Sequence, residues 1–288
     1  MASDTAVVLK YIDYRDSDRI VSLLTEKNGL VSVIARRARS SKSLFSGVID
    51  IGNIVKVELK EPKQGSSSTL WNLNHAKIVE GFLHSRRNII AFGLLSYCCE
   101  TTLSLIASEQ REQKHYGLLC NSLSVLNDAI VDNRSAEELL PGFIIGFSLK
   151  LLAFSGLRPQ LSQCAHCHSN QFDQQGWRVV PLHLTFVHRK CQQDFVENLL
   201  MSGPASTSIL GPPCSDQWRC DVQTALLSPL AETCRQEERM KRLSNGPFWA
   251  ISEMIEHAIE RQLDSTQFLK ELNQTTMGLQ QLIQRPTQ

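Results

Sequence analysis

Residues 19–35 read RIVSLLTEKNGLVSVIA, and this stretch decides the fold of the N-terminal part of the chain. Two apolar runs, Arg19–Thr25 and Leu30–Ala35, flank the segment Glu26-Lys27-Asn28-Gly29. Asn-Gly between two such runs is the strongest short-range signal for a β-hairpin, because both residues tolerate the positive φ of a tight turn. The stretch therefore predicts two antiparallel strands.

Three further segments around this hairpin have the composition of strands. Thr5–Ile12 is rich in β-branched residues, Asn53–Leu59 alternates between apolar and charged side chains, and Leu70–Val79 gives a fifth strand. Residues 61–68, EPKQGSSS, have the composition of a loop. Five short strands without a long helical period predict a small barrel of the OB type, with an SH3-like barrel as the alternative.

The composition limits the classes of protein to which the chain can belong. It has 288 residues, 42% of them hydrophobic, and a formal net charge of +1. A sizeable core is therefore expected, and any nucleic-acid surface must be a local patch. No apolar run reaches the ~18 residues of a membrane span, and the start, MASD, lacks the features of a signal peptide. Nine cysteines, an odd number at irregular spacing, favour a reducing compartment, so we expect a cytoplasmic protein.

The periodicity of the apolar residues becomes helical after the predicted barrel. A Ser135 and Glu138 capping box starts one of these helices, and Gly156 and Pro159 follow its end. Helical spacing covers Asn88–Ala107, Gln113–Val131, Ser135–Phe154, Asp221–Arg239 and Trp249–Leu263, and a short last helix begins near Asp264. The polar tail after Thr276 is expected to fray.

Two short Cys/His motifs predict a metal site. Cys164-Ala-His-Cys167 and His188-Arg-Lys-Cys191 each place two ligands at one turn, and about twenty residues separate them. Four protein ligands would leave no open position, so one structural Zn²⁺ is expected at Cys164, Cys167, His188 and Cys191. His166, His168 and His183 are alternative ligands, and metal-free cysteines in a small hairpin are the other interpretation.

A basic run follows the third predicted strand. Arg36-Arg37-Ala-Arg39-Ser-Ser-Lys42 carries four cations in seven residues, and on the rim of a barrel it suits phosphate contacts. The alternative is a solvated loop. Lys10 could extend this surface, Tyr11, Tyr14 or Trp71 could stack on bases, and Arg86 and Arg87 are weaker candidates. The candidate DNA-binding set is Arg15, Arg19, Arg36, Arg37, Arg39, Lys42 and Lys56.

Enzyme motifs are absent from the sequence. It contains no G-x-x-x-x-G-K-[ST], G-x-S-x-G or H-E-x-x-H pattern. A zinc deaminase is excluded because Lys77 stands where its glutamate belongs and Gln163 precedes Cys164. A metal-dependent hydrolase would need an open metal position, which a four-ligand set does not offer. We therefore expect no catalytic residues, no enzymatic activity and no small-molecule substrate.

Several stretches of the chain, taken in order, resemble a known family. They are Ala6–Leu9, Asp13–Val21, Leu23–Thr25, Gly29–Leu30, Ala35–Arg39 with Lys42-Ser43, Leu151–Leu152, Gly156–Pro159, Cys164-x-x-Cys167, Ile255–His257 and Ser265–Leu269. Their order and spacing resemble the RecO family of bacterial recombination mediator proteins. The chain departs from the zinc-bearing members at His188, where a second cysteine pair is usual, and some members lack the metal.

The resemblance implies an α+β multidomain protein. Its parts would be an OB-fold DNA-binding domain at 1–82, an α-helical domain at 83–160 and 192–275, an inserted zinc-finger-like segment at 161–191 and a polar tail at 276–288. It also implies DNA repair by homologous recombination in the bacterial cytoplasm, at the nucleoid. The implied partners are single- and double-stranded DNA, RecR, the C-terminal tail of the single-strand binding protein SSB and, indirectly, RecA. The competing interpretation is another zinc-containing OB-fold module that binds RNA or DNA without mediator activity.

Overall fold

The computed structural model describes residues 2–40, 42–62, 69–106, 112–172, 174–200 and 209–283 of the chain, without the side chains of residue 2 and of 276–283. Most of the loop predicted at 61–68 lies outside these residues. The chain divides into two compact units, Met1–Asn133 and Arg134–Gln288, and each is described by itself.

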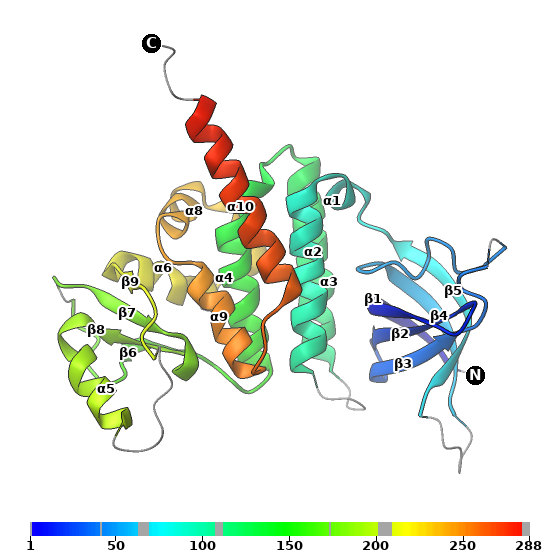
Figure 1. The fold of residues 1–288 in the computed structure, drawn as a ribbon, viewed down its shortest axis with the longest axis horizontal. Helices are drawn as coiled ribbons and strands as arrows, with labels where there is room; N and C mark the ends of the chain where they lie inside the picture. The colour runs from blue at the N-terminus through cyan, green and yellow to red at the C-terminus, as the bar shows by residue number, and fades with distance from the viewer. Residues whose placement is uncertain are drawn as a thin grey trace. The chain divides into compact units, whose positions relative to one another are not determined.

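The first unit contains a closed five-stranded barrel, which confirms the predicted OB-like fold (Figure 1). Around the barrel the order is β1-β2-β3-β5-β4, with a parallel pairing between β3 and β5 and antiparallel pairing elsewhere. The predicted hairpin joins β2 to β3, where Thr25 pairs with Gly29 at a φ of +69°. The five strands are β1 Ala2–Tyr14, β2 Asp18–Thr25, β3 Gly29–Ala35, β4 Ile54–Lys60 and β5 Trp71–Glu80.

Alternate residues of these strands fill the barrel interior, as the period of two in a β-strand requires. Phe45 and Ile49, from the segment between β3 and β4, join them in the same core. The apolar interior therefore consists of Ala6, Val8, Val21, Leu23, Val31, Val33, Ala35, Ala38, Phe45, Ile49, Val55, Val57, Leu59, Leu73 and Ala76.

Three helices complete the first unit: α1 (Leu83–Arg87), α2 (Ile89–Leu105) and α3 (Gln113–Val131). The bounds of α3 are those predicted, and α2 begins one residue after its cap, Asn88. The Asn88 side chain accepts hydrogen bonds from the backbone N–H groups of Ile90 and Ala91 at 3.0 and 2.9 Å. This cap satisfies two donors that the first turn of a helix leaves without partners.

Arg86, at the junction between β5 and the helices, holds α1 to the barrel. Its guanidinium donates to the carbonyl oxygens of Gly81 and Ile51 at 2.7 and 2.6 Å and to Asn53 Oδ1 at 2.7 Å. The Asn53 amide donates in turn to the carbonyls of Gly47 and Val48. The Arg86 guanidinium therefore has a structural role, because it is occupied by these hydrogen bonds. This role was not expected from the sequence, where Arg86 was a weak candidate for DNA binding.

The second unit is built around α4 (Ala136–Phe154), whose residues are buried on nearly every side. The predicted cap is confirmed, since Ser135 Oγ accepts from the Glu138 N–H at 3.4 Å. The predicted end is confirmed too: Gly156 has a φ of +81°, and the Leu157 N–H donates to the Leu152 carbonyl at 2.8 Å. Among the described helices, α4 packs against α6 (Asp216–Leu227), α7 (Leu230–Arg235), α8 (Glu237–Ser244) and α9 (Trp249–Ala258).

Two glycines of α4 let these neighbours approach closely. A Cβ at Gly142 would lie 2.1 Å from Met240 Sδ, and one at Gly146 would lie 2.7 Å from Leu230 Cδ1. The side chains of α8 and α7 therefore occupy the space above the α4 backbone. No local pattern in the sequence indicates this role of Gly142 and Gly146, because it depends on the packing of α7 and α8.

The C-terminal helices differ from the prediction in three places. The continuous helical spacing expected over Asp221–Arg239 is wrong, because Ser228-Pro229 and Gln236 divide it among α6, α7 and α8. The segment Trp249–Leu263 is helical only to Ala258, and Glu260 has a φ of +54°. The last helix, α10 (Asp264–Ile283), is longer than expected and continues past Thr276, where fraying was predicted.

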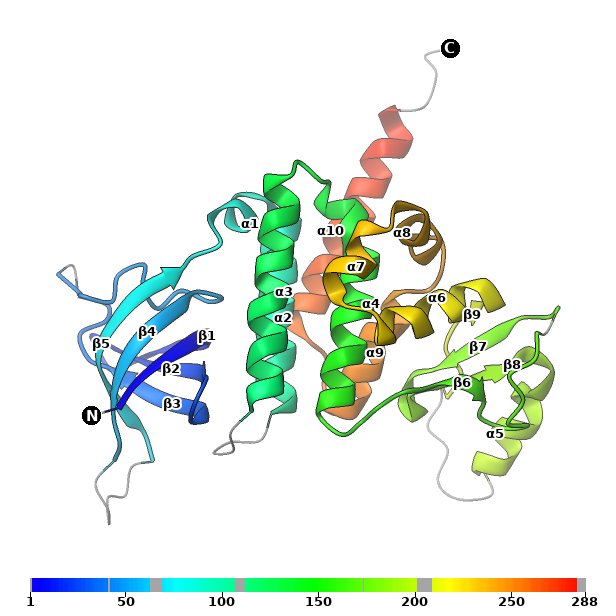
Figure 2. The same ribbon diagram turned by 180° about the vertical axis from the view of Figure 1, so that it is seen from behind.

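A small four-stranded sheet follows α4 in the order β6-β8-β7-β9 (Figure 2). The 3₁₀ turns η1 (Pro181–His183) and η2 (Arg189–Cys191) flank β8, and α5 (Gln192–Leu200) follows η2. The strands are β6 Gln160–Cys164, β7 Trp177–Val180, β8 Thr185–His188 and β9 Pro213–Cys214. None of the helices in the described ranges has the length and hydropathy needed to cross a membrane.

Replacing Arg86 with alanine should destabilise the first unit by about 2–4 kcal/mol, because three charge-assisted hydrogen bonds are lost and their partly buried acceptors are left without this donor. Urea unfolding measures this change. Arg87→Ala is the matched control, since Arg87 is an exposed neighbour on the same helix. Equal urea midpoints for the two variants would contradict the role assigned to Arg86.

Candidate metal centre and nucleic-acid interface

The four residues of the two Cys/His motifs lie together. Cys164 ends β6, Cys167 lies in the following turn, His188 ends β8 and Cys191 lies in η2. The ligand atoms of these four side chains are all within 4.8 Å of one another, so the cluster could hold a metal ion. Cys164, His188 and Cys191 are buried, whereas Cys167 is exposed.

The surroundings of His188 orient its imidazole toward the sulfur atoms. Nδ1 lies 3.3 Å from Cys167 Sγ, and Nε2 lies 3.2 Å from the carbonyl oxygen of Gln171. When Nε2–H donates to that carbonyl, Nδ1 keeps its lone pair for a metal, which is the usual arrangement of a metal-bound histidine. The indole of Trp177 packs against the same ring, with centroids 3.9 Å apart.

The other candidate histidines lie apart from this cluster. His166 Nε2 is 3.9 Å from a carboxylate oxygen of Asp194, and His183 meets the ring of Phe195 edge-on. His168 is exposed and has a φ of +56°. Among the candidate ligands that the structure describes, three sulfurs and the Nδ1 of His188 form the donor set, which suits a closed tetrahedral site.

Protons compete with a metal for the thiols of the cluster. Burial, followed by the hydrogen bond with Cys167, raises the pKa of Cys191 to about 12. Desolvation also acts to raise the pKa of Cys167, but hydrogen bonds from the Ser169 backbone and the neighbouring thiols, with the charge of Lys190, bring it below its ordinary value. Metal binding must therefore release protons, and it weakens as the pH falls.

A buried polar network joins this segment to α6. The Trp177 indole N–H donates to Asp216 Oδ1 at 2.9 Å, and the Arg219 guanidinium lies 3.2 Å from the same oxygen. Arg219 also donates to the Leu161 carbonyl at 2.8 Å and stacks over the Trp177 ring at 4.3 Å. Sequence reasoning missed this network, because no spacing rule connects residues 161, 177 and 219.

The remaining cysteines lie outside the metal cluster. Cys98, Cys99 and Cys234 are buried, and Cys120, Cys214 and Cys220 are partly buried, all with free thiols. Burial is the largest cause that raises the pKa of Cys234 and Cys214, each to about 12, so both thiols are protonated at neutral pH. A buried, protonated cysteine packs as a small apolar residue.

The basic run after β3 packs against the turn between β1 and β2. The Arg39 N–H donates to the Ser17 carbonyl at 2.9 Å, and the Arg37 N–H donates to Asp18 Oδ1 at 2.8 Å. These bonds bring two parts of the chain together at one end of the barrel. We call the resulting set the arginine cluster: Arg15, Arg19, Arg36, Arg37 and Arg39.

Aspartates partly neutralise the arginine cluster. Asp13 pairs with Arg19 at 3.1 Å and with Arg39 at 3.3 Å. Arg36 and Arg37 are exposed, and within the described part of the chain their guanidinium groups form no ion pair. Asp13 lies more than twenty positions before the basic run, and only the pairing of β1 with β2 brings it beside Arg19.

Tyrosines of β1 lie under the arginines. The Arg19 guanidinium is 4.2 Å from the ring centroid of Tyr11, and that of Arg15 is 5.1 Å from the centroid of Tyr14. One face of each ring is therefore covered by a cation, so these rings orient the arginines. Trp71 is partly buried against the barrel core.

The structure does not bring every predicted cation to this place. Lys42 follows the arginine cluster along the same loop and is exposed. Lys56 lies on β4, where it pairs with Thr5 of β1 and Lys77 of β5. Lys10 pairs with Ser22 in the middle of β1 and β2. A group of exposed guanidiniums at a barrel end can bind phosphates, and Lys56 would belong to a separate contact.

Two family models match the chain. The model described as Recombination protein O N terminal matches residues 1–82, which contain the barrel, and the one described as Recombination protein O C terminal matches residues 86–198. The barrel with its arginine cluster and the four residues of the metal cluster lie within these ranges.

Curated relatives point to the same family. The chain is 32% identical over 170 residues to the DNA repair protein RecO of Symbiobacterium thermophilum, an alignment that covers 59% of this chain and 62% of the relative. It is 32% identical over 163 residues to the protein of that name from Anaeromyxobacter dehalogenans, covering 57% and 60%. For the Myxococcus xanthus protein the identity is 30% over 164 residues, covering 57% and 62%. The chain thus spans about three fifths of the length of these relatives.

Adding Co²⁺ to metal-free protein should give the absorption bands of a tetrahedral cobalt–thiolate site, because three sulfurs and one nitrogen are in place. His188→Ala should shift these bands and weaken binding at least tenfold. His166→Ala serves as the control and should behave as the wild type. If the His166 variant alone loses the bands, the fourth ligand has been misassigned.

Proposed function

Because this chain belongs to the RecO family of DNA repair proteins, we propose that it acts as a mediator of homologous recombination. In this proposal the protein binds single- and double-stranded DNA and anneals complementary strands. With RecR it would help to load RecA on DNA coated by SSB, whose C-terminal tail it would contact. It would work in the bacterial cytoplasm, at the nucleoid.

The observation that carries the DNA-binding part is the arginine cluster on the barrel. Five arginines face three nearby aspartates, Asp13, Asp16 and Asp18, so the surface keeps an excess of positive charge. Arg15, Arg36 and Arg37 are exposed and form no ion pair within the described part of the chain, so their guanidiniums can contact phosphates without exchanging a carboxylate partner. Phosphate contacts fix the position of a strand without reading its sequence.

Annealing fits this type of contact. A protein that holds strands by their phosphates leaves the base edges free to pair with a second strand. The step is non-covalent, so the proposal needs no catalytic residue. The candidate set for DNA binding remains Arg15, Arg19, Arg36, Arg37, Arg39 and Lys42, with Lys56 as a separate contact on β4.

We also propose that the metal held by Cys164, Cys167, His188 and Cys191 is one structural Zn²⁺. The donor set suits zinc, and four protein ligands leave no position for a substrate. The bound ion would supply folding energy to a segment of short strands, β6 to β8, whose own core is small. The hydrogen bond from His188 to Gln171 supports this assignment.

Replacing Arg36 and Arg37 with glutamine should reduce the slope of log K against log salt for single-stranded DNA by about 1.4, because each phosphate contact contributes about 0.7. Glutamine is preferred to alanine because it keeps the methylene groups of the arginine side chain and removes only the charge. This choice limits the change at position 37, where the backbone φ is +55°. Fluorescence anisotropy with a labelled oligonucleotide at several salt concentrations measures the slope. Lys114→Gln, which removes an exposed cation of α3, is the control and should leave the slope unchanged.

An unchanged slope in the Arg36/Arg37 double variant would mean that the basic run is only a solvated loop. A loss of affinity for one sequence alone would indicate direct readout of bases, and the backbone model would then be wrong.

The protein should anneal complementary oligonucleotides coated with SSB, and RecR should alter the rate of annealing. Loss of fluorescence from a quenched pair of strands follows the reaction. The Arg36/Arg37 double variant should anneal more slowly, in proportion to its weaker binding. Binding to DNA without any annealing would instead favour a zinc-containing OB-fold module that lacks mediator activity.

A further inference from the structure

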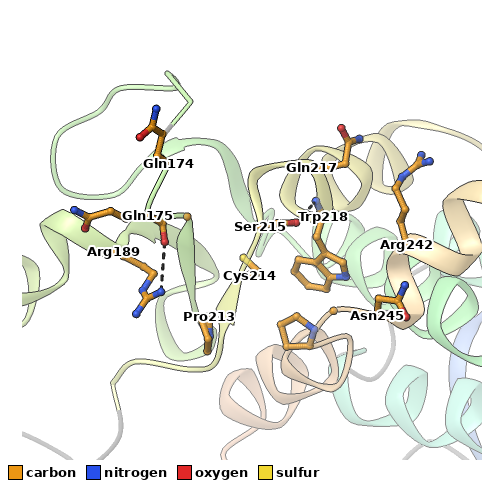
Figure 3. Close-up of a pocket in the computed structure, with 13 residues that line it drawn as sticks. Gln174, Gln175, Arg189, Pro213, Cys214, Ser215, Gln217, Trp218, Arg242 and Asn245 are labelled. Atoms are coloured by element: carbon orange, nitrogen blue, oxygen red, sulfur yellow. Dashed lines mark hydrogen bonds between the residues drawn. The ribbon is translucent and has the colours of Figure 1, made fainter.

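The cavity beside the small sheet, about 510 Å³ in volume, does not bring its charged groups together at one point (Figure 3). Arg189 and Arg242 stand on opposite sides of it, and Arg242 already pairs with Asp221 at 2.6 Å. A more regular surface, an apolar row with cations on both sides, lies on the outside of the barrel in the first unit.

Three isoleucines form this row across β1, β2 and β3. In the strand register Ile12 pairs with Ile20, and Ile20 pairs with Ile34. A strand neighbour of each isoleucine packs in or against the barrel core: Tyr11, Val21 and Val33. Because side chains alternate along a strand, the isoleucines point outward. Directly paired side chains lie about 5 Å apart on one face of a sheet, so the three form a continuous strip, which we call the isoleucine row.

The isoleucine row is exposed, unlike another part of the apolar outer face. Ile12 is 49% exposed, and Ile20 and Ile34 are partly exposed. Leu24, on the same face of β2 as Ile20, is fully buried, and α2 packs against β1. An apolar strip that remains exposed across three strands, with polar residues around it, is typical of a binding surface.

Cations lie on both sides of the isoleucine row. Lys10 comes two residues before Ile12 on the same face of β1 and is exposed. Arg36 comes two residues after Ile34, directly beyond the end of β3. Its guanidinium is exposed and makes no ion pair with the described residues. The row therefore runs between two positions where a phosphate can bind.

A single strand of DNA has the chemistry that this surface complements. Bases offer flat, largely apolar faces, and the phosphates between them carry the negative charge. Two strand-to-strand steps of about 4.8 Å make the row about 10 Å long. That is the length of about three stacked nucleotides at about 3.4 Å each. A protein partner with an apolar segment would use the row but would not need a cation on either side of it.

We propose that the isoleucine row contacts the bases of single-stranded DNA, while Lys10 and the arginine cluster hold the flanking phosphates. The inference rests on the proposed function, because it assumes that DNA lies at this end of the barrel. It adds a preference for strand type, since a duplex keeps its base faces stacked inside and cannot make this contact. Aliphatic side chains form no hydrogen bonds with base edges, so the contact is independent of sequence.

The double substitution Ile12→Thr/Ile34→Thr tests the row. Threonine keeps the β-branched shape that strands favour and removes apolar surface. The variant should bind oligothymidylate about three- to tenfold more weakly than the wild type and bind a duplex of equal length as the wild type does. Its salt slope should be unchanged, because no phosphate contact is removed. Fluorescence anisotropy measures all three quantities, and urea unfolding verifies that the variant is folded.

Ile78→Thr is the matched control. Ile78 is a similarly exposed isoleucine, at 42%, and lies further along β5 than Asn72, the register partner of Ile34. This substitution should change the affinity for oligothymidylate less than twofold.

A second measurement locates the bases directly. Oligothymidylate that carries 5-iododeoxyuridine should form photocrosslinks to the peptide Tyr11–Arg15, which trypsin releases by cleaving after Lys10 and Arg15. This peptide contains Ile12 and also Tyr14, which lies on the same face of β1. Crosslinks to peptides outside the barrel alone would overturn the proposal.

The Arg36/Arg37 double variant, titrated in parallel, separates this inference from the proposed function. If it lowers the salt slope while the isoleucine variant binds single strands as the wild type does, the row does not contact bases and the proposed function stands. If neither variant changes binding, the interface on the barrel is wrong as well.

Two other results would also overturn the proposal. An equal loss of single-strand and duplex binding in the isoleucine variant would mean that the row maintains the shape of the barrel rather than contacting bases. Self-association of the wild type that the isoleucine variant loses, with DNA binding unchanged, would assign the row to a contact between protein copies. Analytical ultracentrifugation measures this self-association.

Discussion

The antiparallel pairing of β1 with β2 and of β2 with β3 is the constraint on which the candidate DNA surface depends. It holds the three strands side by side, so that the turn after β1 and the loop after β3 meet at one end of the barrel. Hydrogen bonds from Arg37 and Arg39 to Asp18 and Ser17 then hold the loop on the turn. Cations that are up to 24 positions apart in the chain become one surface.

In the second unit, polar side chains connect the strands of the small sheet to one another and to α6. The Cys/His cluster ties β6 to β8, and the Asp216 carboxylate ties Trp177 and Arg219 to the start of α6. The Asp216 carboxylate is partly buried, and Trp177 and Arg219, both buried, would each be left with an unpaired donor if it were removed. The metal segment and the start of α6 are thus joined through one polar network.

Local signals in the sequence were sufficient for the barrel and for the metal cluster. The Asn28-Gly29 turn and the alternation of Val55, Val57 and Leu59 specify strands directly. The paired Cys/His spacings placed four ligands at two turns, and the structure brings those same residues together. Features that depend on residues within a few positions of one another could therefore be predicted from the sequence.

What the sequence could not supply are contacts between distant residues. Asp13 neutralises part of the arginine cluster, Arg86 joins α1 to the barrel, and Gly142 receives the side chain of Met240. Each of these depends on strand register or helix packing rather than on local spacing. The same reason explains the error over Asp221–Arg239, since Pro229 ends one helix and begins another while the apolar spacing continues across it.

The most direct test of the central claim, that the barrel end holds the DNA backbone, is hydrogen exchange of the whole protein with and without single-stranded DNA. The account predicts slower exchange in peptides that cover residues 14–19 and 36–42, because a strand on the arginine cluster covers both the turn and the loop. Unchanged exchange in both peptides, at a DNA concentration that saturates binding, would contradict it.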